Sequence, residues 1–124
     1  MPTAINKYGR KINTDGFTFD SQKEYDFYSR FIKGSSFEFT IHPPYHLEDL
    51  SVIDGGVKVR AIRYTPDVVI FNHDGSIKHV YDVKNSFGPY GIDIGNKLRF
   101  NLFARKYGVP VEAVVVRKRD QGVL

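Results

Sequence analysis

The stretch that decides the fold covers residues 66–84 and reads PDVVIFNHDGSIKHVYDVK. Runs of β-branched and aromatic residues stand on either side of Asp74-Gly75, and such runs are typical of strands. An Asp-Gly pair in this setting is a strong signal for a two-residue type I′ hairpin turn. The sequence therefore predicts two paired antiparallel strands, 66–71 and 77–83, within a sheet.

Two aspartates become neighbours in this hairpin, because its register places Asp67 directly opposite Asp82. Opposed residues have Cβ atoms about 4.5–5.5 Å apart, and like charges there are destabilising unless a cation lies between them. Mg²⁺ suits that position, because it prefers carboxylate oxygens and keeps several waters. Lys84 points to the same face and could activate water or stabilise charge on a phosphate. A longer loop at 73–76 would shift the pairing and separate the aspartates. In another interpretation Asp67 only begins a strand after Pro66, and Asp82 and Lys84 are surface residues in a charge ladder.

The length and composition are those of one small domain. The chain has 124 residues, 41% of them hydrophobic, and no cysteine. A single core is expected at this length. Without cysteine, disulfide scaffolds, cysteine-ligated metals and thiol nucleophiles are excluded. Neither a membrane-spanning run nor a signal-peptide apolar region is present, so we expect a cytoplasmic protein with no membrane partner.

The formal net charge of +4 is distributed unevenly along the chain. Residues 1–33 carry +2, residues 34–93 carry −3, and residues 94–124 carry +5. Basic ends that flank an acidic middle are consistent with a polyanionic partner. Ordinary solvated surface charge explains the same numbers.

A helix is predicted over residues 21–33. Ser21 and Glu24 have the spacing of a capping box, apolar residues recur at helical intervals, and Gly34 is a stop signal. Glu24 lies near the apolar stripe that includes Phe27, and buried carboxylates are rarely left without a partner. Glu24 is therefore either a third acid of the site or the closing member of the capping box.

The rest of the chain predicts an α+β domain. A second helix begins at Asp93 and runs through about Tyr107, before the breakers Gly108 and Pro110. We expect a single domain over 1–124 with a basic arm at 1–20, a basic tail at 118–124 and a mixed central sheet between flanking helices. The remaining strands are expected at 37–41, 45–53, 57–64 and 111–117, the strands before the second helix forming an antiparallel meander.

The second predicted helix combines an apolar stripe with basic residues. Its stripe is expected to comprise Ile94, Leu98, Leu102 and Phe103. Phosphate binding is one interpretation of its basic residues, and a solvated helix face is the other. The candidate nucleic-acid contacts are Lys97, Arg99 and Arg105 on this helix, with Lys7, Arg10 and Lys11 in the N-terminal arm.

Other polar or aromatic candidates carry less weight. Pro43-Pro44 prevents a helical zinc pair of His42 and His46, and His73 and His79 straddle the predicted hairpin. All four histidines are expected to be loop or surface residues. Tyr64, Tyr81 and Tyr90 could stack on bases, although strand aromatics are usually part of a core.

These motifs together resemble the PD-(D/E)xK nuclease superfamily. The matching residues are Pro66-Asp67, Asp82-Val83-Lys84 and the helical Glu24. The runs 6–11 and 15–24 are similar to a small family of phage-encoded endonucleases of that superfamily. The likeness covers about residues 6–117, and Asp replaces the commoner Glu before x-Lys.

The resemblance implies a restriction-endonuclease-like core in the order helix, three strands, helix, strand. It implies Asp67, Asp82 and the Val83 carbonyl as metal ligands, Lys84 as the catalytic lysine and Glu24 as a supporting acid. Lys97 matches a basic position that reaches the scissile phosphate.

The function expected from the sequence is that of a Mg²⁺-dependent DNA endonuclease, with Mn²⁺ as a substitute metal. Small phage members of the superfamily include junction resolvases of the endonuclease I type, so we expect a homodimer acting on duplex or branched DNA, including Holliday junctions, in the host bacterial cytoplasm. A non-catalytic DNA-binding accessory protein of phage replication or packaging is the alternative, and an RNA nuclease is a third interpretation.

Overall fold

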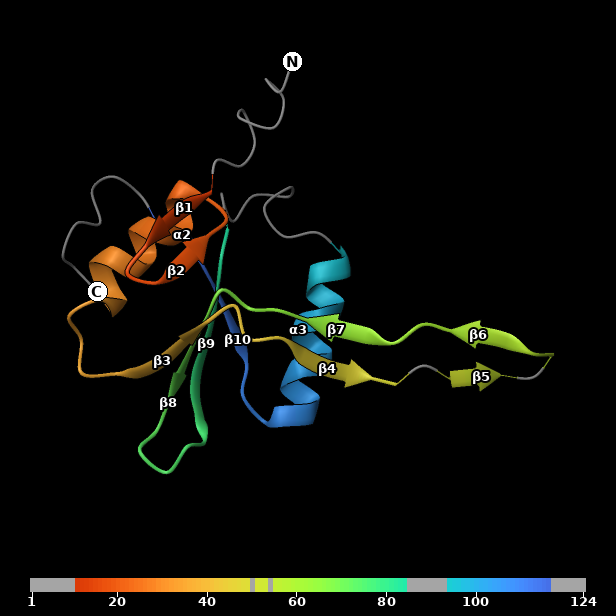
Figure 1. Ribbon diagram of the computed structural model, residues 1–124. Helices are drawn as coiled ribbons and strands as arrows, with labels where there is room; N and C mark the ends of the chain where they lie inside the picture. The colour runs from red at the N-terminus through yellow and green to blue at the C-terminus, as the bar shows by residue number, and fades with distance from the viewer. Residues whose placement is uncertain (1–10, 50, 54, 85–93, 117–124) are drawn as a thin grey trace, which may run out of the picture.

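A computed structural model describes residues 11–49, 51–53, 55–84 and 94–116 (Figure 1). Within these residues no helix is long and apolar enough to cross a membrane. The elements in chain order are β1 (Ile12–Thr14), β2 (Phe17–Phe19), α2 (Gln22–Phe27), η1 (Tyr28–Ile32), β3 (Glu38–Ile41), β4 (Tyr45–Glu48), β5 (Ser51–Ile53), β6 (Val57–Val59), β7 (Ile62–Tyr64), β8 (Val68–Phe71), β9 (Ile77–Val83), α3 (Ile94–Tyr107) and β10 (Val111–Val114).

The centre of the protein is a four-stranded mixed sheet in the order β10-β9-β8-β3. The pairs β3–β8 and β8–β9 are antiparallel, whereas β9 and β10 are parallel and are connected through α3. The α+β class is therefore confirmed. The expected meander is wrong, because β3 pairs with β8 and the four strands between them form a separate ribbon.

The register of the β8–β9 hairpin is the one predicted from the sequence, but its turn is not. Val68 faces Tyr81, which is the predicted pairing. Asn72 donates its backbone N–H to the Ser76 carbonyl, so the loop has one residue more than predicted, with Gly75 at a φ of 89°. A register shift between Ile70 and Phe71 compensates for the extra residue. The bulge thus keeps Asp67 and Asp82 in the opposed positions that a longer loop alone would have separated.

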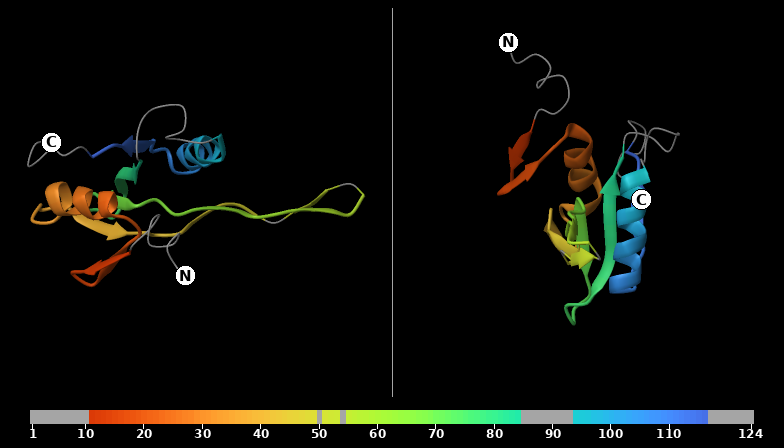
Figure 2. Two further views of the ribbon diagram at one scale, coloured as in Figure 1. Left: turned by 90° about the horizontal axis from the view of Figure 1, so that it is seen from above. Right: turned by 90° about the vertical axis from the view of Figure 1, so that its right-hand side faces the viewer.

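Two apolar clusters cover the two faces of the sheet. Side chains alternate along β8, so Val68 and Ile70 pack against α2 and η1, while Val69 packs on the opposite side with Phe103 of α3. Figure 2 shows the two helical segments on opposite sides of the central strands. Because both faces are covered, the polar side chains of the site gather at one end of the strands.

The first helix begins and ends where the sequence predicts. Ser21 accepts a hydrogen bond from the backbone N–H of Glu24 and caps α2. From Tyr28 the helix continues as the π-helical turn η1, and Lys33 leaves it in an extended conformation. The buried residues Phe27, Tyr28 and Ile32 are the face that packs on the sheet.

The apolar face of α3 differs from the prediction. Phe103 is fully buried, but Leu98 is 52% exposed. Leu102 and Phe103 pack in the core cluster as predicted, but Phe100 and Tyr107 also take part in it, so the buried stripe follows a spacing of three and four residues. The predicted helix cap Asp93 and the side chain of Ile94 lie outside the described residues.

Part of the expected N-terminal arm is a folded hairpin. β1 and β2 are antiparallel, and Thr14 faces Phe17 across a two-residue turn. Asp15 and Gly16 have φ angles of 54° and 82°, which are typical of a type I′ turn. Phe19 is buried in the core cluster beside α2, so the arm prediction is wrong for residues 12–19. Residues 1–10 and the predicted tail lie outside the described residues.

The contacts of Asp15 predict an acid-sensitive contribution to stability. Its carboxylate accepts a hydrogen bond from Tyr28 and lies 3.0 Å from Lys33. The hydrogen bonds from Lys33 and then Tyr28 hold the pKa of Asp15 below 3.8. This stability is therefore present above the unfolded pKa and is lost as the pH falls through the folded pKa. Asp15→Asn should lower the urea midpoint at pH 7, and its difference from wild type should shrink below about pH 4.

Asn tolerates the left-handed backbone at position 15, so the variant isolates the charge from the turn. A midpoint difference that stays constant down to pH 2 would contradict this account of Asp15.

A two-stranded ribbon projects from the body of the protein (Figures 1 and 2). Its inner half pairs β4 with β7, and its outer half pairs β5 with β6. Gly55 and Gly56 have φ angles of 86° and 78° at its tip. The sequence predicted its strands but not their separation from the central sheet.

Candidate functional site

The polar site lies where the connection into β8 meets the end of β9. Asp67 directly precedes β8, and Asp82 is the last residue but one of β9. Their side chains are only 14% and 10% exposed. Two carboxylates so little exposed need hydrogen bonds and cationic neighbours.

Asp82 lies on the α3 side of the sheet, where two groups contact it. Tyr64 donates a 2.6 Å hydrogen bond to its Oδ2, and the Lys84 ammonium lies 3.2 Å from its Oδ1. Burial raises the pKa of Asp82, the nearby charge of Asp67 adds to the increase, and Tyr64 and Lys84 oppose it. Burial also raises the pKa of Tyr64, which keeps its hydroxyl protonated as a donor.

Lys84 is held on the same side by three contacts. Its ammonium pairs with Asp82 and lies 5.7 Å from the centre of the Phe100 ring on α3. Its backbone N–H donates to the carbonyl of Val114 in β10. A lysine fixed in this way presents a positive charge beside the carboxylate with little freedom to move away.

The two carboxylate oxygens of Asp67 have different partners. Oδ2 accepts a 2.6 Å hydrogen bond from the backbone N–H of Val83, and Oδ1 lies 3.6 Å from Nε2 of His42. The Val83 contact seen here is thus made through its N–H, whereas the resemblance implied its carbonyl as a ligand. The side chain of Asp67 links the hairpin that carries Asp82 to the end of β3.

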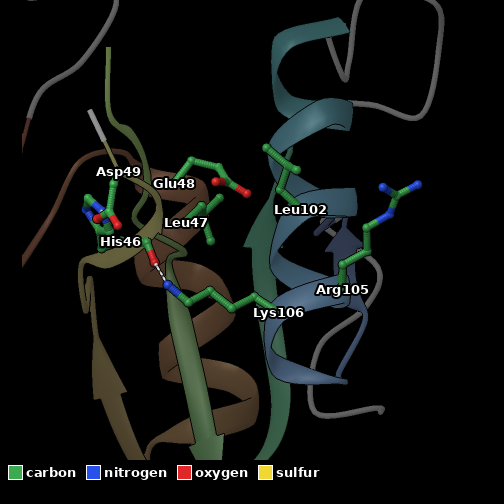
Figure 3. Close-up of a pocket in the computed structure, with 7 residues that line it drawn as sticks. All are labelled: His46, Leu47, Glu48, Asp49, Leu102, Arg105 and Lys106. Carbon is green, nitrogen blue, oxygen red and sulfur yellow. Dashed lines mark hydrogen bonds and ion pairs between the residues drawn. The ribbon is translucent and has the colours of Figure 1, made fainter. Parts of the chain in front are cut away.

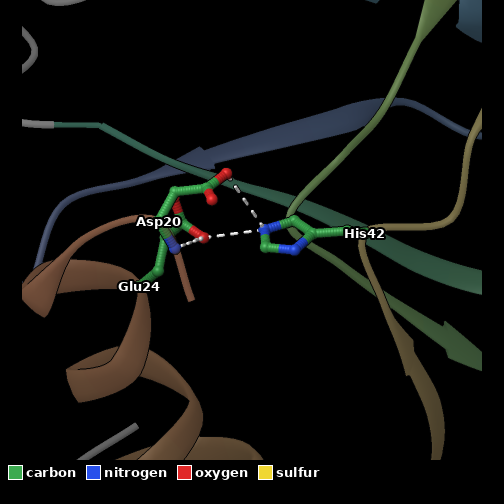
Figure 4. Close-up of side chains that lie close together, drawn as sticks. All are labelled: Asp20, Glu24 and His42. Atoms are coloured by element: carbon green, nitrogen blue, oxygen red, sulfur yellow. Dashed lines mark hydrogen bonds and ion pairs between the residues drawn. The ribbon is translucent and has the colours of Figure 1, made fainter. Parts of the chain in front are cut away.

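His42 joins Asp67 to two acids near the start of α2. Its Nε2 lies 2.8 Å from Glu24 and 3.8 Å from Asp20 (Figure 4). Interactions with Asp67 and then Glu24 raise the pKa of His42 to about 10, against the effect of burial. The imidazolium is therefore the cation that the surrounding carboxylates share.

The structure distinguishes the two interpretations of Glu24. The Ser21 hydroxyl accepts from the Glu24 N–H, as in a capping box. The Glu24 carboxylate, however, does not complete the box: it bonds His42 and lies 3.4 Å from the backbone nitrogen of Asp20. Its side chain is 13% exposed. Glu24 thus belongs to the polar cluster, with Ser21 alone capping the helix.

His42 is a site residue that the sequence reasoning assigned to a loop or the surface. Its side chain is 23% exposed, and its backbone has a φ of 53°. Its N–H donates to the Asp67 carbonyl. The sequence feature that could have indicated this role is the position of His42 directly after the predicted strand 37–41 and before Pro43-Pro44. Among the other histidines, His46 bonds Asp49, His79 bonds Glu112, and His73 is exposed.

The donor set fits a divalent cation. One ligand atom from each of Asp20, Glu24 and His42 lies within 4.8 Å of the others, and Asp67 adds an oxygen at 3.6 Å from the same His42 nitrogen. Carboxylate oxygens suit Mg²⁺, and an added imidazole also suits Mn²⁺. An imidazolium has no lone pair for a metal, so His42 would have to lose a proton to serve as a ligand, and the bound cation would then supply the positive charge among these acids.

The predicted phosphate contacts that the structure describes lie on the surface. Lys97, Arg99 and Arg105 are exposed on α3, and Lys11 is exposed 4.0 Å from Asp20. Lys7 and Arg10 lie outside the described residues.

A separate pocket of about 460 Å³ lies between β4 and the end of α3 (Figure 3). Lys106 closes one side by donating to the His46 carbonyl. Acidic and basic side chains both line it, so its charge favours no single class of ligand. The lining residues are His46, Leu47, Glu48, Asp49, Leu102, Arg105 and Lys106.

Tyr64→Phe should destabilise the protein by about 1–3 kcal/mol, because a buried carboxylate loses its hydroxyl donor. Tyr45→Phe is the matched control, since the Tyr45 ring packs in the same cluster and its hydroxyl makes no hydrogen bond to a described residue. Urea unfolding at pH 7 measures both. Equal losses for the two variants would contradict the role assigned to the hydrogen bond from Tyr64 to Asp82.

These features define a small α+β protein in which carboxylates, a histidine and a lysine gather at one end of a mixed sheet. The chain belongs to a family of proteins of unknown function, DUF1064, whose model matches residues 5–117. No curated protein and no solved structure matches the chain.

Proposed function

We propose that the protein is a metal-dependent DNA endonuclease that hydrolyses phosphodiester bonds. One observation carries the proposal: Asp67 and Asp82 hold opposed positions in the hairpin, and the Lys84 ammonium lies 3.2 Å from Asp82. Two carboxylates and a lysine so arranged provide metal ligands next to a cation that can act on the attacking water or the phosphate. Glu24 and His42 add a further carboxylate and an imidazole next to Asp67.

Asp67 and Asp82 would hold the metal, with Glu24 as the supporting acid. When bound, Mg²⁺ supplies a water of lowered pKa and neutralises charge on the phosphate. The chain's own residues orient these groups: the Val83 N–H fixes one oxygen of Asp67, and the Tyr64 hydroxyl fixes one oxygen of Asp82. The remaining oxygens, Oδ1 of both aspartates, are those nearest to His42 and Lys84.

Lys84 would stabilise the developing negative charge of the phosphate or hold the attacking water. Its position between Asp82 and the Phe100 ring limits its movement. The basic residues of α3, with Lys11, would bind the DNA backbone, since phosphate contacts position a protein on DNA without reading its sequence.

The substrate class and assembly rest on the resemblance and are part of the proposal. We propose a phage-encoded enzyme that acts as a homodimer on duplex or branched DNA, with four-way junctions included. A two-fold dimer offers two equivalent sites to the two strands of a duplex or a junction.

Metal removal tests the proposal. Purified protein should nick supercoiled plasmid and a synthetic four-way junction in Mg²⁺ or Mn²⁺, and EDTA should stop cutting completely. Cutting that persists in EDTA would contradict metal dependence. DNA binding without cutting in either metal would favour a non-catalytic accessory protein, and preferential cutting of a matched RNA would contradict the DNA assignment.

A further inference from the structure

The projecting ribbon is directly continuous with the candidate site at both of its strands. His42 is followed by Pro43-Pro44 and then β4, while β7 ends at Tyr64, three residues before Asp67. Tyr64 also bonds Asp82. A partner bound along the ribbon would therefore lie next to these side chains.

Aromatic packing fixes the base of the ribbon to the body. Tyr45 and Tyr64 face each other across the β4–β7 pair. Their ring centres lie 5.1 Å and 5.9 Å from that of Phe103 in α3. Because Phe103 is fully buried, the inner half of the ribbon is anchored in the core. The outer half has no such support, and Val52 is 65% exposed there.

The two strands of the ribbon carry opposite charges. Glu48 and Asp49 lie on the strand before the tip, whereas Lys58, Arg60 and Arg63 lie on the strand after it. The three basic side chains are exposed, and none forms an ion pair with any residue that the structure describes. The strand after the tip therefore carries three cations that no described acidic residue neutralises.

We propose that the ribbon binds a groove of duplex DNA beside the cleavage position, with Lys58, Arg60 and Arg63 contacting phosphates. This inference rests on the proposed nuclease function and adds a substrate-binding surface to it. The major groove of B-DNA is about 12 Å wide and admits a two-stranded ribbon. Strands rise about 3.3 Å per residue, so the ten residues from Tyr45 to the tip reach roughly 30 Å, or about nine base pairs.

The triple variant Lys58→Gln/Arg60→Gln/Arg63→Gln tests the contacts. Its affinity for a fluorescent 30-base-pair duplex is measured in EDTA over a range of NaCl concentrations, so that cutting does not interfere. Each lost phosphate contact lowers the salt slope by about 0.9, so we expect a slope smaller by about 2–3 and binding at least about tenfold weaker at 0.15 M salt. Lys78→Gln, an exposed lysine near the β8–β9 turn, is the single-charge control and should keep the wild-type slope.

A shortened ribbon tests the geometry independently. Replacing residues 51–59 by Asn-Gly keeps β4 and β7 and removes the outer strands. The footprint of the wild-type protein on a duplex should extend farther from the cleavage positions than the footprint of the shortened variant, because each ribbon covers additional base pairs. An unchanged footprint would overturn the inference.

The outcomes separate this inference from the proposed function. An unchanged salt slope in the triple variant, with wild-type cutting intact, overturns the role of the ribbon alone. Wild-type protein that binds but never cuts, with a reduced slope in the variant, supports the ribbon and contradicts hydrolysis. Wild-type protein that binds no DNA at all overturns both.

Discussion

Lys84→Gln is expected to lower the rate of DNA cutting by about 10²–10³-fold, the range found when a group that stabilises charge in the transition state is lost. Glutamine retains a polar donor of similar length but removes the positive charge beside Asp82. The buried carboxylate loses a charged partner, so a stability loss of about 1–3 kcal/mol should accompany the change. Single-turnover cutting of a labelled duplex, at a temperature where both proteins are folded, measures the effect.

Lys78→Gln is the matched control, because Lys78 lies near the start of β9, the strand that Lys84 directly follows, and its ammonium lies over the Phe37 ring, away from the aspartates. It should cut at the wild-type rate. Equal rates for Lys84→Gln and wild type would remove Lys84 from the proposed mechanism.

Phe103→Ala should cost about 3–5 kcal/mol of folding free energy, which is typical for a buried phenylalanine. Phe103 is fully buried and touches Tyr45, Tyr64 and Tyr107. Alanine would leave a cavity between α3, the sheet and the base of the ribbon. Since small domains are stable by about 5–15 kcal/mol, the loss is a large fraction of the total. The midpoint of urea unfolding measures it.

Leu98→Ala on the same helix is the control. Leu98 is 52% exposed, so the change should stay within about 0.5 kcal/mol. A loss at Leu98 as large as that at Phe103 would restore the four-residue stripe expected from the sequence and contradict the packing of α3 described above.

Local patterns predicted the hairpin at the centre of the fold because strand alternation and an Asp-Gly turn act over short distances. The pairing of Val68 with Tyr81 agrees with that prediction. The agreement depends on two departures that cancel: a loop one residue longer and a bulge beside Ile70. Turn chemistry alone does not determine where a bulge falls. The same Asp-Gly rule, applied to Asp15-Gly16, would have predicted the β1–β2 hairpin.

Tertiary contacts explain what the sequence could not predict. The buried face of α3 follows Phe100 and Phe103 because their rings meet Tyr64, which lies far away in the chain. His42 joins the site because β3 pairs with β8 and brings its end to Asp67. The ribbon lies outside the central sheet because β3 pairs with β8, and the four strands between them in the chain pair only with one another. Each of these depends on long-range pairing, which periodicity does not encode.

The most direct test of the proposed function compares supercoiled-plasmid cutting by wild type and Asp67→Asn in saturating Mg²⁺. Asparagine keeps an oxygen that can accept the Val83 N–H, so the hairpin should remain folded while one anionic ligand is lost. We expect Mg²⁺-dependent cutting by the wild-type protein and a rate at least about a hundredfold lower for the variant. Equal cutting by the two proteins would contradict a metal site at Asp67 and Asp82.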